Sequence, residues 1–171
     1  SLPKAVSLFH RILNKRLVDY LASNNYIDTT IQKGAMPGTK FGIPEHLYKV
    51  KSVFKDAFKY QKPAFILFLD IKNAFGNLHL QQLYHIMEKY HIAKELIDYI
   101  KEFHKTFEFI TELDDKNAPF IKWNDGLVQG SPLSPILFVL VMNYILKYLD
   151  QKYLNTHGYK YHNTRRILFT A

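Results

Sequence analysis

The chain has 171 residues, of which 47% are hydrophobic and 15% aromatic, so it can build the core of one domain and is not a disordered segment. The formal net charge is +8 and there is no cysteine, which excludes a disulfide framework and a thiolate zinc site. No apolar run has transmembrane length and no signal-peptide pattern follows Ser1, so we expect an intracellular protein, in a compartment that the sequence leaves open, without a membrane partner.

The positive charge is concentrated at the front of the chain. Residues 1–62 hold 11 Lys or Arg against 4 Asp or Glu, a net of +7, whereas residues 63–171 hold 12 against 11. This distribution suits a surface that faces phosphates, and on charge alone it suits a solvated basic face equally well. Because the chain begins without Met, we expect it to be a piece of a longer protein.

Two amphipathic helices are predicted in this basic half. Residues 2–21 carry apolar side chains at three- and four-residue steps. The polar face of that helix holds His10, Arg11, Lys15 and Arg16, which could contact a nucleic-acid backbone but which we expect to be solvated. Residues 31–40 contain two glycines and one proline and are predicted to form a loop. A second helix is predicted over residues 44–60, with an apolar face made of Leu47, Val50, Phe54, Ala57 and Phe58.

A continuous apolar run at residues 64–69 ends in a carboxylate. The run is rich in aromatic side chains, which predicts a short strand buried on both faces. Asp70 follows directly, and a carboxylate in that place is costly unless a basic side chain or a divalent cation pairs with it. Hard cations such as magnesium prefer carboxylate oxygens. Asp70 is therefore the first candidate site residue.

The second half of the chain is predicted to hold three helices and a hairpin. Asn77 is expected to cap a helix over residues 78–90, which a second helix follows over residues 93–104. Alternation over residues 106–113 and 120–123 predicts a hairpin whose turn holds Asp114 and Asp115, two acids that are expected to be solvated. Residues 126–135 form a predicted loop with two glycines, Ser134 and Pro135 are expected to start an apolar helix over residues 136–153, and a last strand is predicted from Arg165 onward.

Four of these segments, in this order, resemble a reverse transcriptase of the non-LTR (LINE-like) retrotransposon type. Residues 68–75, FLDIKNAF, resemble polymerase motif A, and residues 126–135, GLVQGSPLSP, resemble motif B. Upstream, QKGAMPG at residues 32–38 with PEH at 44–46, and LPKAVSLFHRIL at 2–13, are similar to elements that precede motif A in such enzymes. The resemblance covers most of the chain.

The resemblance implies an α+β fold, in which the fingers and palm of a right-hand polymerase place helices on a small, mostly antiparallel sheet. The fingers would comprise residues 1–62 and 77–122, and the palm residues 63–76 and 123–171. The implied parent activity is that of an RNA-directed DNA polymerase, which adds deoxynucleotides to a DNA primer on an RNA template by two-metal catalysis with Mg²⁺.

Roles for individual residues follow from the positions that match the two motifs. Asp70 would be the catalytic carboxylate and metal ligand, with the backbone carbonyl of Ile71 as a further metal ligand. The residues implied in substrate binding are Ile71, Phe75, Gln129 and Gly130. Phe75 would be the steric gate beneath the sugar, although its spacing alone favours a core aromatic. The residues implied in nucleic-acid binding are Lys33, Gly34, Pro37, Gly38 and Lys40.

The sequence also departs from the family pattern. The family's second carboxylate pair should follow the strand that begins near Arg165, where the sequence stops, and Asp114 with Asp115 precedes motif B and cannot replace it. Position 35 is Ala where the family often has an aromatic residue. We therefore expect the 171 residues alone to be inactive.

Two alternatives remain open at this point. The chain could be a catalytically dead remnant, or a split protein that a second polypeptide completes, and then serve as an RNA-binding or scaffold component of a ribonucleoprotein. It could also be a basic globular domain whose motif matches are due to chance.

Overall fold

The computed structural model describes residues 2–34, 42–109, 120–161 and 165–167. The elements, in chain order, are α1 (Lys4–Ser23), α2 (Gly42–Lys59), α3 (Leu80–Lys89), α4 (Lys94–Thr106), β1 (Glu108–Phe109), β2 (Ile121–Lys122), α5 (Ser134–His157), β3 (Tyr159–Tyr161) and β4 (Arg165–Ile167). The α+β class predicted from the sequence is confirmed. Within the ranges given above, every helix is too short or too polar to cross a bilayer.

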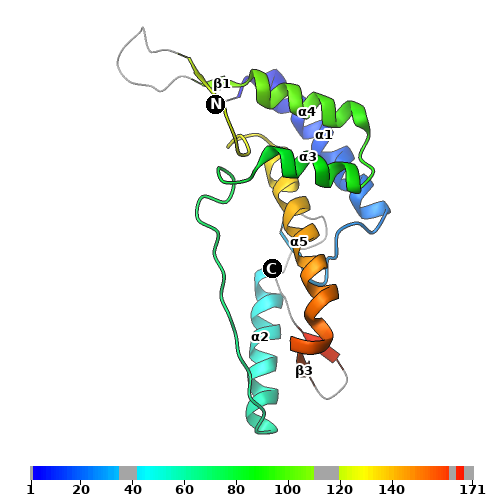
Figure 1. The fold of residues 1–171 in the computed structure, drawn as a ribbon, viewed down its shortest axis with the longest axis vertical. Coiled ribbons are helices and arrows are strands. Elements are labelled where there is room, and N and C mark those ends of the chain that lie inside the picture. Colours follow the sequence, from blue (N-terminus) through cyan, green and yellow to red (C-terminus); the bar gives the residue numbers. More distant parts are fainter. Residues whose placement is uncertain (1, 35–41, 110–119, 162–164, 168–171) are drawn as a thin grey trace.

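One apolar cluster joins four of the helices. It is formed by α1, α3, α4 and the first half of α5, which lie together in the upper part of Figure 1. Its fully buried members include Leu21, Leu83, Met87, Ile100 and Leu140. These side chains recur at helical spacing in the sequence, so the predicted helices and this core agree.

Helix α2 lies outside this cluster, beside the second half of α5 and close to β3 (Figure 1). Its buried residues are Val53, Asp56 and Ala57, whereas Phe54 and Phe58 of the predicted apolar face are exposed, Phe58 by 82%. The prediction for that face is therefore correct for Ala57 and wrong for Phe54 and Phe58. A polar contact joins β3 to α2. The Tyr159 hydroxyl donates a hydrogen bond of 2.8 Å to Asp56 Oδ2.

The strands form two small antiparallel sheets. β1 pairs with β2, with Glu108 opposite Lys122, which confirms the predicted hairpin; its turn, with Asp114 and Asp115, lies outside the described residues. β4 pairs with β3, with Tyr159 opposite Ile167. The predicted strand at the end of the chain is therefore confirmed over residues 165–167, and its partner β3 was not predicted.

The strand predicted at residues 64–69 is absent. Residues 62–71 belong to no helix or strand, and Phe65 and Phe68 are 96% and 82% exposed. Figure 1 shows this segment as the long connection from the end of α2 back to α3. An apolar run becomes a buried strand only where other strands pair with it, and the strands in the described part of the chain pair with each other instead.

Candidate active site

The segments that resemble motifs A and B meet in the structure. Residues 72–77 form a turn in which the Asn77 amide donates to the Asn73 carbonyl at 2.9 Å. At the same turn the Phe75 carbonyl accepts a hydrogen bond of 2.8 Å from the backbone amide of Leu127. We call residues 72–77 with residues 126–131 the A–B junction. This junction brings together two segments that lie about fifty positions apart in the chain.

Gly126 allows this close approach. Its φ angle is +83°, and a Cβ placed there would lie 2.6 Å from the Gly76 carbonyl oxygen and 2.8 Å from the Phe75 carbonyl oxygen. Both the left-handed backbone and the contact with another backbone exclude a side chain. A glycine at position 126 is therefore a geometric requirement of the A–B junction.

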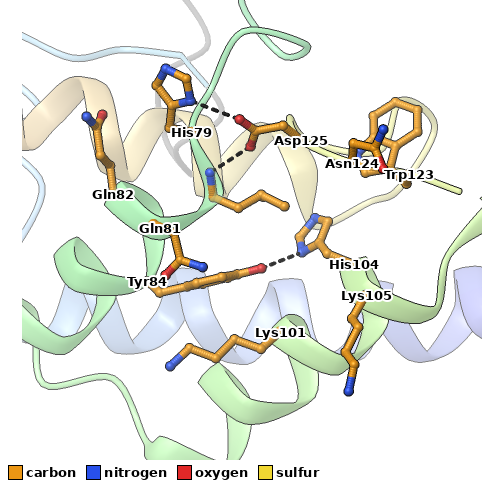
Figure 2. A pocket seen from close by; sticks show the side chains of 11 residues that line it. His79, Gln81, Gln82, Tyr84, Lys101, His104, Lys105, Trp123, Asn124 and Asp125 are labelled. Carbon is orange, nitrogen blue, oxygen red and sulfur yellow. Dashed lines mark hydrogen bonds and ion pairs between the residues drawn. The ribbon is translucent and has the colours of Figure 1, made fainter.

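Asp125 ties the same junction to the start of α3 (Figure 2). Its Oδ1 accepts hydrogen bonds from the backbone amides of Leu80 at 3.0 Å and Gly126 at 2.9 Å, and its Oδ2 lies 2.8 Å from Nδ1 of His79. Burial raises the pKa of Asp125, but these hydrogen bonds outweigh it, so the pKa is lower than usual. Asp125 is thus a charged cap at the N-terminus of α3, where carboxylates are stabilised.

The predicted cap of α3 was wrong. The N-cap position is His79, and its side chain makes no capping hydrogen bond. The Asn77 side chain instead donates to the Lys72 carbonyl at 2.8 Å, inside the turn of the A–B junction. Asp125 was not predicted as a site residue, because it lies 45 positions after the Leu80 amide that it caps.

An open hollow of about 900 Å³ lies beside Asp125. Figure 2 shows Tyr84, Lys101, His104, Lys105 and Trp123 around it. Burial raises the pKa of Tyr84 to about 12 and lowers the pKa of His104, so both groups are neutral near pH 7. The indole N–H of Trp123 donates to the Gly126 carbonyl at 2.8 Å, which links the wall of the hollow to the A–B junction. The residues predicted for the site do not line this hollow.

Asp70 and Ile71 precede the A–B junction on the irregular segment. Asp70 is exposed, and Ile71 is 46% exposed, so the carboxylate does not carry the burial cost expected for it. Its oxygens are suitable ligands for a hard divalent cation. The described ranges contain no group of three His, Cys, Asp or Glu side chains that could hold a metal ion. A role of Asp70 in binding a metal ion therefore stays a prediction.

Phe75 is a core contact. Its ring is partly buried against the main cluster and stacks on Phe138 of α5, with ring centroids 5.2 Å apart and an angle of 27° between the planes. This agrees with what its spacing alone favours. A role as steric gate stays a prediction.

Gln129 and Gly130 lie on the exposed side of the A–B junction. Gly130 has a φ of +88°, and a Cβ placed there would have no neighbour within 4 Å. In the free protein its backbone conformation, and not crowding, is what requires glycine. The space in front of Gly130 is open, and the predicted role of Gln129 and Gly130 in substrate binding stays a prediction.

Two serines and one histidine hold the buried side of the loop before α5. Ser134 Oγ donates to the Val128 carbonyl at 2.6 Å, so it does not cap α5 as predicted, and the N-cap position is Leu133. His10 of α1 is completely buried, with Nδ1 2.8 Å from Ser131 Oγ. Its assignment to a solvated face was wrong.

The sequence carries a signal that could have placed His10 correctly. It lies seven residues before Leu17 and eleven before Leu21, and such spacing puts all three on one stripe of a helix. Leu17 and Leu21 are both buried in the main cluster. His10 was assigned to the polar face because its side chain is polar, although its spacing places it on the apolar stripe.

The predicted nucleic-acid loop is only partly described. Lys33 forms an ion pair of 2.9 Å with Glu45, and this hydrogen bond from Lys33 lowers the pKa of Glu45. Gly34 is exposed, whereas Pro37, Gly38 and Lys40 lie outside the described residues. The role of this loop in binding nucleic acid stays a prediction.

Comparison with known proteins agrees with the motifs. Residues 4–163 match the family model described as reverse transcriptase (RNA-dependent DNA polymerase). The chain is 26% identical, over 147 residues, to a retrovirus-related Pol polyprotein from type-1 retrotransposable element R2 of Nasonia vitripennis, and 29% identical, over 146 residues, to one from type-2 retrotransposable element R2DM of Drosophila melanogaster. These matches cover 86% and 85% of the chain but 14% of each relative. No solved structure matches it.

Proposed function

We propose, from the premise that this chain belongs to the reverse transcriptase family, that it is part of an RNA-directed DNA polymerase that adds deoxynucleotides to a DNA primer on an RNA template. The observation that carries this proposal is the hydrogen bond between Phe75 and Leu127, which joins the two polymerase motifs at one place. Two matching motifs that meet in space are stronger support for a shared site than either motif alone. The relatives are several times longer, so the activity is proposed for the whole protein.

The proposed roles follow from the match of each residue to motif A or motif B, and Asp70 and Ile71 lie directly before the A–B junction. The Asp70 carboxylate and the Ile71 carbonyl are oxygen ligands for Mg²⁺, together with ligands from outside the described residues. The cation, when bound, lowers the pKa of the primer 3′-hydroxyl. Gln129 and Gly130 lie against the nascent base pair on their exposed side, and Phe75 faces the sugar. The division into fingers (residues 1–62 and 77–122) and palm (63–76 and 123–171) is part of the same proposal.

The template is proposed to lie along the basic side of α2. An open hollow of about 290 Å³ on that helix is lined by Lys51, Lys55 and Lys59, with Tyr48 and Tyr161 beside them. The three lysines are exposed. Tyr48 is 73% exposed. Ammonium groups next to an exposed aromatic ring suit a single strand, because they bind its phosphates while the ring can stack on its bases.

The test is primer extension by the full-length protein on an RNA template with Mg²⁺. Asp70→Asn keeps the size of the side chain and removes its charge, so we expect extension to fall by at least about a hundredfold while RNA affinity stays within about twofold. Asp98→Asn is the matched control, because Asp98 is an exposed acid of α4 that pairs with Lys94. Equal extension by wild type and Asp70→Asn would overturn the assignment.

A further inference from the structure

A row of three polar side chains, buried at His10 and Ser131 and partly buried at Tyr99, joins the A–B junction to the helical core. His10 of α1 lies in the middle, with Nδ1 2.8 Å from Ser131 Oγ and Nε2 2.8 Å from the hydroxyl of Tyr99 in α4. The row crosses from α4 through α1 to the loop that precedes α5. It therefore connects the helical core to the residue that directly follows Gln129 and Gly130.

The His10 ring is held in one orientation. It is completely buried, and its ring meets that of Phe103 edge to face, with centroids 4.6 Å apart. Both ring nitrogens have a hydrogen-bond partner, so turning the ring over would put carbon atoms against the buried hydroxyl of Ser131 and the partly buried hydroxyl of Tyr99. The partner groups thus fix the position of the imidazole on two opposite sides.

All hydrogen bonds in this row can form between uncharged groups. Burial lowers the pKa of His10, so its imidazole is neutral, with one N–H donor and one acceptor nitrogen. Either tautomer satisfies both hydroxyl groups, because each hydroxyl can donate or accept. Ser131 Oγ also accepts the backbone amide of Leu133 at 3.3 Å. Ser131 is consequently bound both to α1 and to the start of α5.

Anchors lie on both sides of the exposed dipeptide Gln129–Gly130. On one side, the Leu127 amide is bound to the Phe75 carbonyl at 2.8 Å, and the Val128 carbonyl is bound to Ser134 Oγ. On the other side stands Ser131 with His10. Gly130, with its φ of +88°, lies in a turn that the Ser131 amide closes by a hydrogen bond of 3.3 Å to the Val128 carbonyl. This turn would be less firmly held if one of the two sides were released, since glycine adopts many backbone conformations.

We propose that His10 is a positioning residue of the polymerase reaction: through Ser131 it holds the backbone of Gln129 and Gly130 in the conformation that receives the nascent base pair. This inference rests on the proposed function. His10 does not touch the substrate, and its effect passes only through the Ser131 end of the row. The Tyr99 end contributes to the stability of the fold.

The two ends of the row provide a matched pair of variants for the full-length protein. Ser131→Ala and Tyr99→Phe each remove one hydroxyl group from His10, the first at the loop and the second in the core. We expect Ser131→Ala to raise the KM for the incoming deoxynucleotide by about fivefold to tenfold, the equivalent of about one lost hydrogen bond, with kcat changed by less than about twofold. We expect Tyr99→Phe to change KM by less than about twofold. Its melting temperature should fall at least as far as that of Ser131→Ala.

His10 itself is tested by a second pair. His10→Asn places an amide group near the position of Nδ1 and can keep the bond to Ser131, whereas His10→Gln places it near Nε2 and can keep only the bond to Tyr99. We expect the KM of His10→Asn to be close to that of the wild type. The KM of His10→Gln should be close to that of Ser131→Ala. If KM rises in proportion to the loss of melting temperature in all four variants, or does not rise in Ser131→Ala, the positioning role is wrong.

Asp70→Asn, measured beside these variants, separates the two proposals. If the wild-type protein extends primers and Asp70→Asn does not, the polymerase function is supported. The KM values of the other variants then test only the role of His10. A full-length protein that does not extend primers at all would overturn both. If Ser131→Ala does not fold, the comparison of His10→Asn with His10→Gln gives the decision.

Discussion

Asp125 Oδ1 lies 3.0 Å from the backbone nitrogen of Leu80, so the residue before motif B caps the helix that follows motif A. The same oxygen also accepts the amide of Gly126. One carboxylate therefore stabilises a helix end and a turn of the candidate site together. The segments on both sides of α3 and α4 are linked through it.

Removal of this cap should destabilise the protein. Asp125→Ala leaves the Leu80 and Gly126 amides without their acceptor, and we expect the free energy of unfolding to fall by about 1–2 kcal/mol. Asp125→Asn keeps an acceptor oxygen and should lose less than half of that, because the side chain is 44% exposed and its charge is partly screened. Urea unfolding at pH 7 measures both values. Equal losses for Ala and Asn would show that charge, and not capping, is the main contribution.

Stability should decrease below about pH 6.5 because of buried histidine. Burial lowers the pKa of His104 below its usual value of 6.5 in the folded protein, whereas the unfolded chain keeps the usual value and binds more protons. The contribution of His104 is therefore complete above pH 6.5 and is lost as the pH falls toward the folded pKa, by at most about 1.4 kcal/mol per pH unit.

Urea unfolding between pH 7.5 and pH 5 measures this dependence. His104→Gln should flatten the curve by up to one proton, and His10→Gln should do the same because burial also lowers the pKa of His10. His85→Gln, at an exposed position of α3, is the control and should leave the slope unchanged. A slope that neither buried variant alters would contradict the prediction.

The two glycines of the A–B junction should respond differently to alanine. Gly130→Ala introduces only left-handed strain, about 1–2 kcal/mol, because its Cβ would meet nothing within 4 Å. Gly126→Ala adds a collision with the Gly76 carbonyl oxygen at 2.6 Å, for which we expect a further ~1–3 kcal/mol. Thermal unfolding ranks the two variants, and a Gly130→Ala protein less stable than Gly126→Ala would contradict the geometry.

Neutralising the basic side of α2 should weaken RNA binding in a way that depends on salt. We expect the combined variant Lys51→Gln, Lys55→Gln and Lys59→Gln to bind single-stranded RNA more weakly at 0.1 M salt, with the slope of log affinity against log salt reduced by about 2. The control replaces the exposed Lys4, Lys15 and Lys94 by Gln and makes the same change in net charge. Fluorescence anisotropy at several salt concentrations measures both, and equal slopes would show that only net charge matters.

Local patterns predicted the helices of this chain well, because each helix is satisfied by its own backbone hydrogen bonds and by one apolar stripe. Residues 2–21 and 93–104 were predicted within a few residues of α1 and α4. The strand at residues 64–69 was wrong, because a strand depends on partners elsewhere in the chain that its own composition does not show. Phe65 shows the difference most clearly, since it is aromatic and almost fully exposed.

The motif residues of the candidate site could be named from the sequence, and their roles stay predictions, but the contacts that support these residues could not be predicted. Gln129 and Gly130 were found from the motif B pattern, and Gly130 does have the positive φ angle that glycine allows. Asp125 and His10 act on groups that lie 45 and 121 positions away. No local pattern contains that information, because such contacts arise only when the helices pack.

Residues 62–71 link two parts of the protein that are also bound to each other without them. The His10–Ser131 hydrogen bond and the Asp56–Tyr159 hydrogen bond both join a residue before this segment to one after it. If a protease cut the exposed chain near Phe65, the two pieces would therefore remain together as a noncovalent pair. Residues 62–71 thus serve as a covalent linker. The residues before and after this linker contribute to the same core.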